Sequence, residues 1–122
     1  MSAALTTAYA RGTAFERRVK AALERAGWLV VRSAGSHSPA DLVAWSPAEQ
    51  PYGSVCWLIQ AKRAGVPSAG DRVALLAWAD RAGATAILVR PRLGGGLDWR
   101  RWHTGRHRWV PQPLADPWAL GD

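Results

Sequence analysis

The chain has 122 residues, of which 48% are hydrophobic, a length that suits one compact domain with one core. Sixteen basic residues against nine acidic ones give a formal net charge of +7 and a sequence pI near 11.0, which favours a polyanionic partner such as nucleic acid. The single cysteine, Cys56, excludes an internal disulfide and a cysteine-rich zinc module, and its apolar neighbours predict a buried small side chain.

The ends of the chain carry no sign of secretion or membrane insertion. Residues 1–12 lack a sustained apolar stretch, and no later segment approaches the roughly 20 apolar residues of a membrane span. We therefore expect an intracellular, cytoplasmic protein with one domain over residues 1–122.

A helix is predicted over residues 14–26, with Thr13 as its cap and Gly27 as its end. Its apolar residues recur at the spacing of one buried helical face: Phe15, Val19, Ala22, Leu23 and Ala26.

Three short apolar runs follow, over residues 28–32, 41–45 and 55–61, and each is bounded by Gly, Pro or Ser as strands often are. The second and third runs are expected to form a hairpin across residues 47–53.

The second half of the chain predicts another helix, a buried strand and an edge strand, over residues 71–82, 85–90 and 97–103. Val73, Leu76, Ala77 and Asp80 share one side of that helix. The order α-β-β-β-α-β-β predicts an α/β domain with a mixed central sheet flanked by helices.

The last segment, residues 109–122, is rich in proline and is not expected to continue a sheet, because proline cannot donate to a strand ladder. It is either a docked arm that carries Trp118 or a loose tail.

Polar residues at the predicted element ends suggest a metal site. Asp41 opens the second strand, Gln60 and Lys62 lie two apart on the third and so share a face, and Glu16 borders the buried stripe of the first helix. Two carboxylates and an amide oxygen suit Mg²⁺, with Mn²⁺ as a substitute, better than zinc. Each residue alone is more often structural, but together they predict metal ligands at Glu16, Asp41 and Gln60.

Lys62 is one of only two lysines beside fourteen arginines, and it is positioned to stabilise charge on a phosphate or to orient a water. The arginines crowd into short runs at residues 17–18, 100–101 and 106–108, as expected for phosphate contacts. Trp99 and Trp102 either pack in a core or dimer contact, which we favour, or stack on exposed bases.

Three segments carry a family resemblance: residues 9–17, which include Tyr-Ala-Arg-Gly and Phe-Glu-Arg, residues 27–36, Gly-Trp-Leu-Val-Val-Arg-Ser-Ala-Gly-Ser, and residues 41–44, Asp-Leu-Val-Ala. Over roughly residues 9–90 the chain resembles the archaeal-type Holliday junction resolvases, which also occur in viruses. The resemblance implies a PD-(D/E)XK nuclease-like fold and a homodimeric, metal-dependent endonuclease that cuts four-way DNA junctions symmetrically, in a host cytoplasm if the protein is viral.

Matched to the family's motifs, Glu16, Asp41 and Lys62 take catalytic roles and Ser36 takes that of a catalytic-loop serine. Arg17 and Arg32 take DNA or active-site contacts, and His37, beside the loop, is a candidate phosphate contact. The expected DNA-binding residues are Arg11, Arg17, Arg32, Ser36, His37, Arg63, Arg100 and Arg101.

Gln60 departs from the family, which usually has a glutamate there, so the site keeps an oxygen ligand but loses a negative charge. The stretch over residues 46–54 is also longer than the family pattern leads us to expect. Two alternatives stay open: another structure-specific DNA endonuclease of the same fold, and a noncatalytic junction-binding protein.

Overall fold

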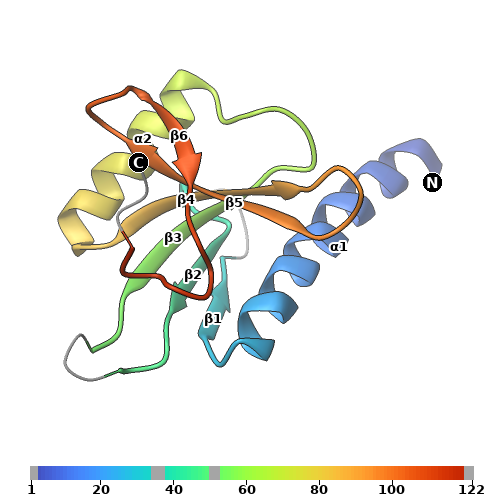
Figure 1. Ribbon diagram of the computed structural model, residues 1–122. Coiled ribbons are helices and arrows are strands. Elements are labelled where there is room, and N and C mark those ends of the chain that lie inside the picture. The colour runs from blue at the N-terminus through green and yellow to red at the C-terminus, as the bar shows by residue number, and fades with distance from the viewer. Residues whose placement is uncertain (1–2, 34–37, 50–52, 120–122) are drawn as a thin grey trace.

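A mixed six-stranded sheet forms the centre of the molecule, as seen in a computed structural model that describes residues 3–33, 38–49 and 53–119 (Figure 1). The elements in chain order are α1 (Ala3–Arg25), β1 (Leu29–Arg32), β2 (Leu42–Trp45), β3 (Cys56–Ala61), α2 (Ala69–Ala82), β4 (Thr85–Pro91), β5 (Leu97–His103) and β6 (Arg108–Pro111). The strands lie side by side in chain order, and all neighbours are antiparallel except β3 and β4. The predicted α/β class with a mixed sheet is confirmed.

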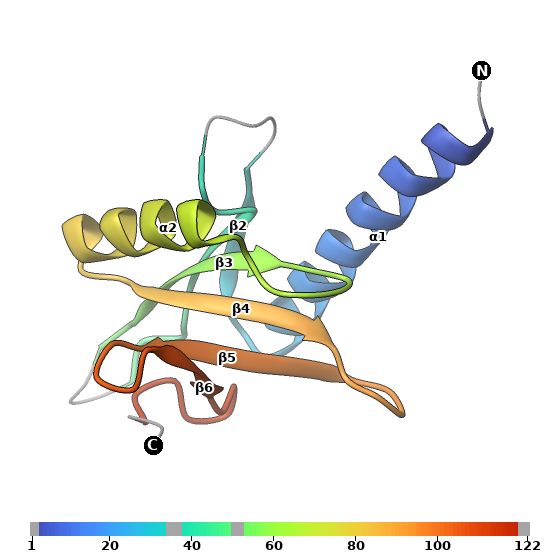
Figure 2. The same cartoon turned by 90° about the horizontal axis from the view of Figure 1, so that it is seen from above.

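The two helices cover opposite faces of the sheet. On one face, Phe15, Val19 and Leu23 of α1 pack in a cluster with Ile59 of β3. On the other face, residues of α2 pack against Leu58, the neighbour of Ile59 on β3. Neighbouring strand residues point to opposite sides, so these two clusters are separate layers. Figure 2 shows α2 running alongside β3 and β4, with α1 extending away from it.

The first helix begins earlier than predicted. Thr13 lies inside α1, which starts at Ala3, so its prediction as the cap is wrong. Alanine is the strongest helix former, and the alanine-rich segment before Thr13 continues the helix despite Gly12. Gly27 has φ of 89°, a left-handed conformation that glycine adopts readily, and it ends the helix as predicted.

The side of the second helix that carries Val73, Leu76, Ala77 and Asp80 is not its buried side. Leu75 and Ala79 are its buried residues, whereas Val73 is 60% exposed and Asp80 is exposed. Alanine and leucine occur all around this helix, so the pattern does not single out one face. Its start is set by Ser68, whose side chain accepts a hydrogen bond from the backbone N–H of Asp71 over 3.1 Å.

The proline-rich end does continue the sheet, so that prediction is wrong for its first residues. β6 pairs antiparallel with β5, which makes β6 rather than β5 the edge strand and adds a third strand after α2. Pro111 is tolerated because it is the last residue of an edge strand.

Beyond β6 the described residues form a docked arm, one of the two expected alternatives. The backbone N–H of Gln112 donates to the carbonyl of Trp99 over 2.9 Å, and its Nε2 donates to the carbonyl of Asp116 over 3.2 Å. Leu114 packs against the cluster on the α1 face.

The tryptophans mainly build the core. Trp57 is fully buried, with ring centroids 4.5 Å from Trp28 and 5.9 Å from Trp99. Trp102 is buried beneath Arg72, whose guanidinium lies 4.5 Å from the ring centroid. The packing role predicted for Trp99 and Trp102 is confirmed.

The remaining expectations are simple to place. β2 and β3 form the predicted hairpin, closed by a bridge between Glu49 and Gly53. Cys56 is partly exposed rather than fully buried, and burial raises the pKa of its thiol. Neither helix, within the described residues, is both long and apolar enough to cross a bilayer.

Candidate active site

Asp41 is held by three backbone hydrogen bonds at the point where β2 begins. Its N–H donates to the carbonyl of Ile59 over 2.8 Å, and its carbonyl accepts from the N–H of Ser33 over 2.9 Å. Its carboxylate Oδ2 accepts from the N–H of Ala61 over 2.9 Å. The carboxylate is therefore fixed beside the end of β3, opposite Gln60.

Several charges act on this carboxylate. Burial raises the pKa of Asp41, the N–H of Ala61 lowers it, and the negative charge of Glu16 raises it again. The positive charges of Lys62 and Arg32 lower it, and the net effect is a raised pKa. The predicted Glu16, Asp41 and Lys62 thus lie in one electrostatic neighbourhood, although they come from three different elements.

Glu16 is paired with Arg32. Nε of Arg32 donates to Oε1 of Glu16 over 2.9 Å, and both side chains are largely shielded from solvent. This bond and the charge of Glu16 raise the pKa of Arg32, with a smaller contribution from Tyr9. Tyr9, which lies on α1 two turns before Glu16, is a neighbour of the site that the sequence prediction did not include.

The side-chain amide of Gln60 has a hydrogen-bond partner for its nitrogen, and no described donor for its oxygen. Its side chain is only 7% exposed, and Nε2 donates to the carbonyl of Pro39 over 2.7 Å. No described residue donates a hydrogen bond to Oε1, which is buried. A buried acceptor without a donor is costly, and a cation would satisfy it.

The donor set suits a hard cation. Asp41 lies opposite Gln60, whose amide oxygen is unpaired, and Glu16 acts on Asp41 through its charge; oxygen ligands of this kind fit Mg²⁺ or Mn²⁺. The described residues contain no cluster of three or more His, Cys, Asp or Glu side chains, so the third protein oxygen in this set comes from an amide. The predicted ligands therefore fit the predicted metal.

Lys62 continues the face of Gln60. Its N–H donates to the carbonyl of Val89 over 2.9 Å, which extends the parallel pairing of β3 and β4 by one residue. Because alternate residues share a face, the side chains of Gln60 and Lys62 leave the sheet on the same side.

Some of the residues predicted to contact DNA are exposed, and others are held in ion pairs. Arg11, Arg17 and Arg63 are exposed, Arg32 is bound to Glu16, and Arg100 is bound to Asp98 over 2.9 Å. Ser36 and His37 lie outside the described residues.

Arg100 and Arg101 follow each other on β5 and so project from opposite faces. Only Arg100 shares the face of Gln60, through the register Gln60, Leu88, Arg100. The sequence prediction treated these two arginines as one cluster, and the alternation of a strand separates them.

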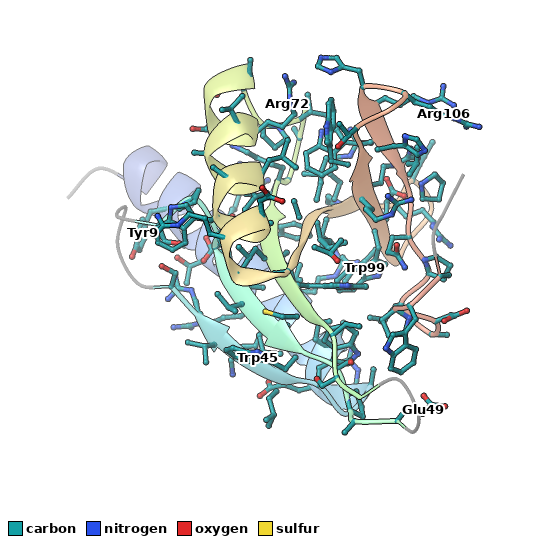
Figure 3. All side chains as sticks on the ribbon, turned by 90° about the vertical axis from the view of Figure 1, so that its left-hand side faces the viewer. Tyr9, Trp45, Glu49, Arg72, Trp99 and Arg106 are labelled. Carbon is teal, nitrogen blue, oxygen red and sulfur yellow. The ribbon has the colours of Figure 1, made fainter. Side chains whose placement is uncertain are left out.

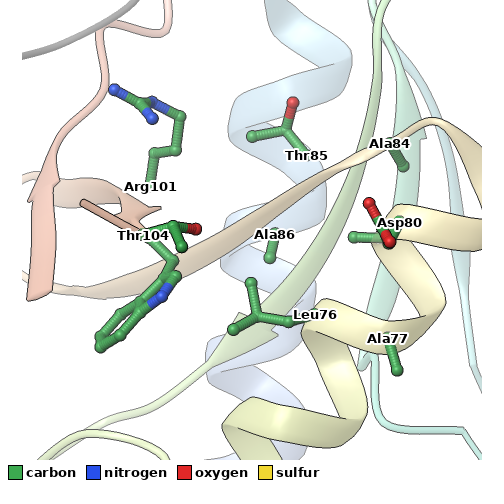
Figure 4. A pocket seen from close by; sticks show the side chains of 10 residues that line it. Leu76, Ala77, Asp80, Ala84, Thr85, Ala86, Arg101 and Thr104 are labelled. Atoms are coloured by element: carbon green, nitrogen blue, oxygen red, sulfur yellow. The ribbon is translucent and has the colours of Figure 1, made fainter. Parts of the chain in front are cut away.

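A cavity of about 630 Å³ lies elsewhere, between α2 and the start of β4, where Leu76, Asp80 and Thr85 line it (Figure 4). Lys62 pairs near the opposite end of β4, at Val89, so this cavity is separate from the carboxylates.

The mixed sheet, the carboxylates, the amide and the lysine together match the pattern of a PD-(D/E)XK nuclease fold that the resemblance predicts. The sequence profile described as "Archaeal holliday junction resolvase (hjc)" matches residues 7–103. The chain belongs to this family, and it is a Holliday junction resolvase by membership, as the resemblance predicted.

A solved structure supports the assignment. The chain is similar to Hjc of Archaeoglobus fulgidus, described as a Holliday junction resolvase from an archaeal hyperthermophile, with a TM-score of 0.53 and 27% sequence identity over 71% of each chain. No curated protein sequence matches the chain.

Proposed function

We propose that this resolvase hydrolyses phosphodiester bonds with a divalent cation held by Glu16, Asp41 and Gln60. The observation that carries the proposal is the buried Oε1 of Gln60, which lacks a donor among the described residues and lies opposite the fixed carboxylate of Asp41. Mg²⁺ is the preferred ion and Mn²⁺ the expected substitute. When bound, the cation supplies polarisation of the scissile phosphate and lowers the pKa of a coordinated water.

The residues around the ligands have separate tasks. Ala61 fixes the orientation of Asp41 through its N–H, and Arg32 fixes that of Glu16 through Nε. Lys62, on the face of Gln60, stabilises negative charge on the phosphate or orients the attacking water. For Ser36 we propose the catalytic-loop role that the family resemblance implies.

Positive side chains on several elements would bind the DNA backbone. Arg11 and Arg17 are exposed on α1, and Arg63 is exposed directly after Lys62. Arg32, Arg100, Arg101 and His37 complete the proposed set. Contacts of this kind are made to phosphates and therefore weaken as salt rises.

A second copy of the chain would complete the enzyme, because a four-way junction presents two symmetry-related strands for cutting. A candidate dimer face consists of Leu29, Val31 and Trp45, which are 73%, 56% and 40% exposed. Leu29 pairs with Trp45 and Val31 with Val43, so these apolar side chains share the sheet face that α1 does not cover. Figure 3 looks onto this side, with Trp45 beside the strands and α2 over the neighbouring part of the sheet.

Such a face favours an isologous contact, in which the same patch of each copy packs against its counterpart.

Because the substrate is DNA, we propose that the protein acts inside a cell.

The deciding experiment compares cleavage of a four-way junction, a flap, a mismatch and plain duplex DNA, with Mg²⁺, with Mn²⁺ and with a chelator. We expect paired cuts in the junction that need the cation. Preferred cutting of a flap or mismatch would instead indicate another structure-specific nuclease, and junction binding without any cutting would indicate a noncatalytic binder.

A further inference from the structure

A groove of about 460 Å³ lies beside the candidate active site, at the end of β4 and the turn into β5. We call it the arginine groove, and define it by Arg63, Arg90, Arg92, Arg100 and Asp98. Four guanidiniums against one carboxylate leave positive charge in excess. The groove therefore suits an anion.

Asp98 brings two of the arginines together. Its Oδ2 accepts from Nε of Arg100 over 2.9 Å and lies 3.5 Å from Nη2 of Arg90. Nη1 of Arg90 also lies 3.5 Å from the carbonyl of Gly65. A guanidinium has five N–H donors, so each arginine keeps donors for a second partner.

The other two arginines are not paired. Among the described residues, neither Arg63 nor Arg92 has a carboxylate within ion-pair distance, and both are exposed. Arg92 stands at the turn, where its N–H donates to the carbonyl of Gly96 over 3.0 Å. The groove thus combines two oriented guanidiniums with two exposed charges at its rim.

Strand register joins this groove to the sheet face of Gln60 and Lys62. Arg90 pairs with Asp98, and it follows Val89, the residue whose carbonyl accepts from Lys62. Gln60, Lys62, Arg90, Asp98 and Arg100 therefore leave the sheet on one side.

The spacing of the strands suits phosphates a few nucleotides apart. Adjacent strands lie roughly 4.8 Å apart, so β5 lies about 10 Å from β3. DNA rises about 3.4 Å per nucleotide on each strand, and about 10 Å therefore corresponds to about three nucleotides.

We propose that the arginine groove binds backbone phosphates up to about three nucleotides from the bond that is cut, and that Asp98 is a positioning residue for Arg90 and Arg100. The placement relative to the cut bond rests on the proposed function. Arginine suits this task because its planar fork binds phosphate oxygens in pairs, and a carboxylate behind the fork fixes its plane.

The role of Asp98 separates two physical explanations. If the groove attracts DNA only by net charge, Asp98→Asn removes a repulsive carboxylate and binding becomes tighter. If Asp98 orients the guanidiniums, the same change weakens binding although the protein becomes more positive. We expect a several-fold loss of affinity, measured by fluorescence anisotropy on a labelled junction.

The first experiment uses the full chain in a chelator, so that binding is read without cleavage. The double variant Arg90→Gln, Arg92→Gln is compared with a control that has the same charge change, Arg25→Gln, Arg81→Gln, at the last turns of α1 and α2. We expect the groove variant to lower the slope of log affinity against log salt by about two, as for two lost phosphate contacts, and the control to leave it near wild type.

Arg92→Gln alone, at an exposed position, guards against misfolding of the double variant, and should lower the slope by about one. Equal slopes for groove and control variants would overturn the proposal.

The second experiment replaces single phosphates along one junction arm by neutral methylphosphonates. Wild type should lose affinity at one to three successive positions, and the Arg90→Gln, Arg92→Gln variant should show no further loss at those positions. A loss of the same size in both proteins would place those phosphates elsewhere on the protein.

Both readouts are binding measurements. If the groove variants weaken binding but wild type never cuts DNA, only the proposed hydrolysis is contradicted. If wild type cuts DNA but the groove variants bind like the control variant, only the proposal for the groove is contradicted.

Discussion

Arg32 donates a hydrogen bond through Nε to Oε1 of Glu16 over 2.9 Å, so the acid of α1 and the last residue of β1 form one unit. The bond fixes where the Glu16 carboxylate points, and the charge of Arg32 also lowers the pKa of nearby Asp41. Arg32 therefore contacts one proposed metal ligand, Glu16, directly and acts on the other, Asp41, through its charge.

This pairing predicts that Glu16→Gln abolishes cleavage, by about a hundredfold or more, and leaves junction binding within about twofold, because an anionic ligand is lost without a change in shape. Arg32→Lys keeps a positive charge but loses the guanidinium fork, and should slow cleavage roughly ten- to a hundredfold. Single-turnover cleavage and anisotropy measure the two effects. Full activity in Glu16→Gln would show that Glu16 is an ordinary helix-surface residue with no role in cleavage.

Asp41→Asn should abolish cleavage and preserve both binding and the fold. Asparagine keeps an oxygen that can accept from the N–H of Ala61, so the end of β3 stays paired. Asp80→Asn, at an exposed position of α2, is the matched control and should cleave like wild type. Wild-type turnover by Asp41→Asn would exclude Asp41 from the reaction.

The raised pKa of Asp41 also gives a stability prediction, whose sign follows from linkage. In the folded chain the protonated carboxyl is favoured relative to the unfolded value near 3.8, so this stabilising contribution is complete below that value and is lost as pH rises through the raised folded pKa. Without metal at neutral pH, Asp41→Asn should therefore unfold at the same or a higher temperature than wild type.

Adding Mg²⁺ should raise the unfolding temperature of wild type and leave that of Asp41→Asn nearly unchanged. On acidification, half-maximal cleavage should need more Mg²⁺, because a proton on Asp41 competes with the cation. An Asp41→Asn protein that is much less stable than wild type would show that the ionised carboxylate stabilises the fold.

Much of this site could be predicted because its residues stand next to clear element boundaries. Asp41 and Lys62 flank apolar runs that did become β2 and β3, Gln60 lies within β3, and the alternation of a strand puts Gln60 and Lys62 on one face. The partners of these side chains could not be predicted in the same way. Asp98 contacts Arg90 on the neighbouring strand, beyond a glycine-rich turn. Pro39, just before β2, accepts a hydrogen bond from Gln60 on the neighbouring strand β3.

The mistaken predictions have local causes. Proline predicts a break in the sheet, but at the final position of an edge strand the N–H that Pro111 lacks costs nothing. Leu75 and Leu76 are adjacent on α2, and Leu75 is fully buried in the cluster with Leu58 and Ala86 whereas Leu76 packs only partly against it. Which side chains of a helix or strand become buried thus depends on the residues of other elements that pack against it.

The apolar face of β1 and β2 predicts the effect of a charge on assembly. Val31→Glu or Trp45→Glu should convert a dimer to a monomer, because a second copy would have to bury the new carboxylate. Size-exclusion chromatography with light scattering measures this, and Leu93→Glu, at a fully exposed turn position, is the control. A dimer that persists in both face variants would place the interface on another surface.

Gln60→Glu tests the one ligand that departs from the family pattern. A carboxylate at position 60, opposite Asp41, attracts a divalent cation more strongly, so half-maximal cleavage should need less metal. The maximal rate should not rise, because the added negative charge repels the phosphate and can form an ion pair with Lys62.

The same change also removes a donor. Nε2 of Gln60 donates to the carbonyl of Pro39 over 2.7 Å, and a carboxylate there would face another acceptor, so without metal Gln60→Glu should unfold at a lower temperature than wild type.

Gln112→Glu is the matched control, because Gln112 is also buried and its Nε2 also donates to backbone carbonyls. It should lower the unfolding temperature without changing the metal requirement. The measurement is cleavage rate against Mg²⁺ and Mn²⁺ concentration for the three proteins. If Gln60→Glu and Gln112→Glu both keep the wild-type metal dependence, Oε1 of Gln60 is not a ligand, and its burial needs another explanation.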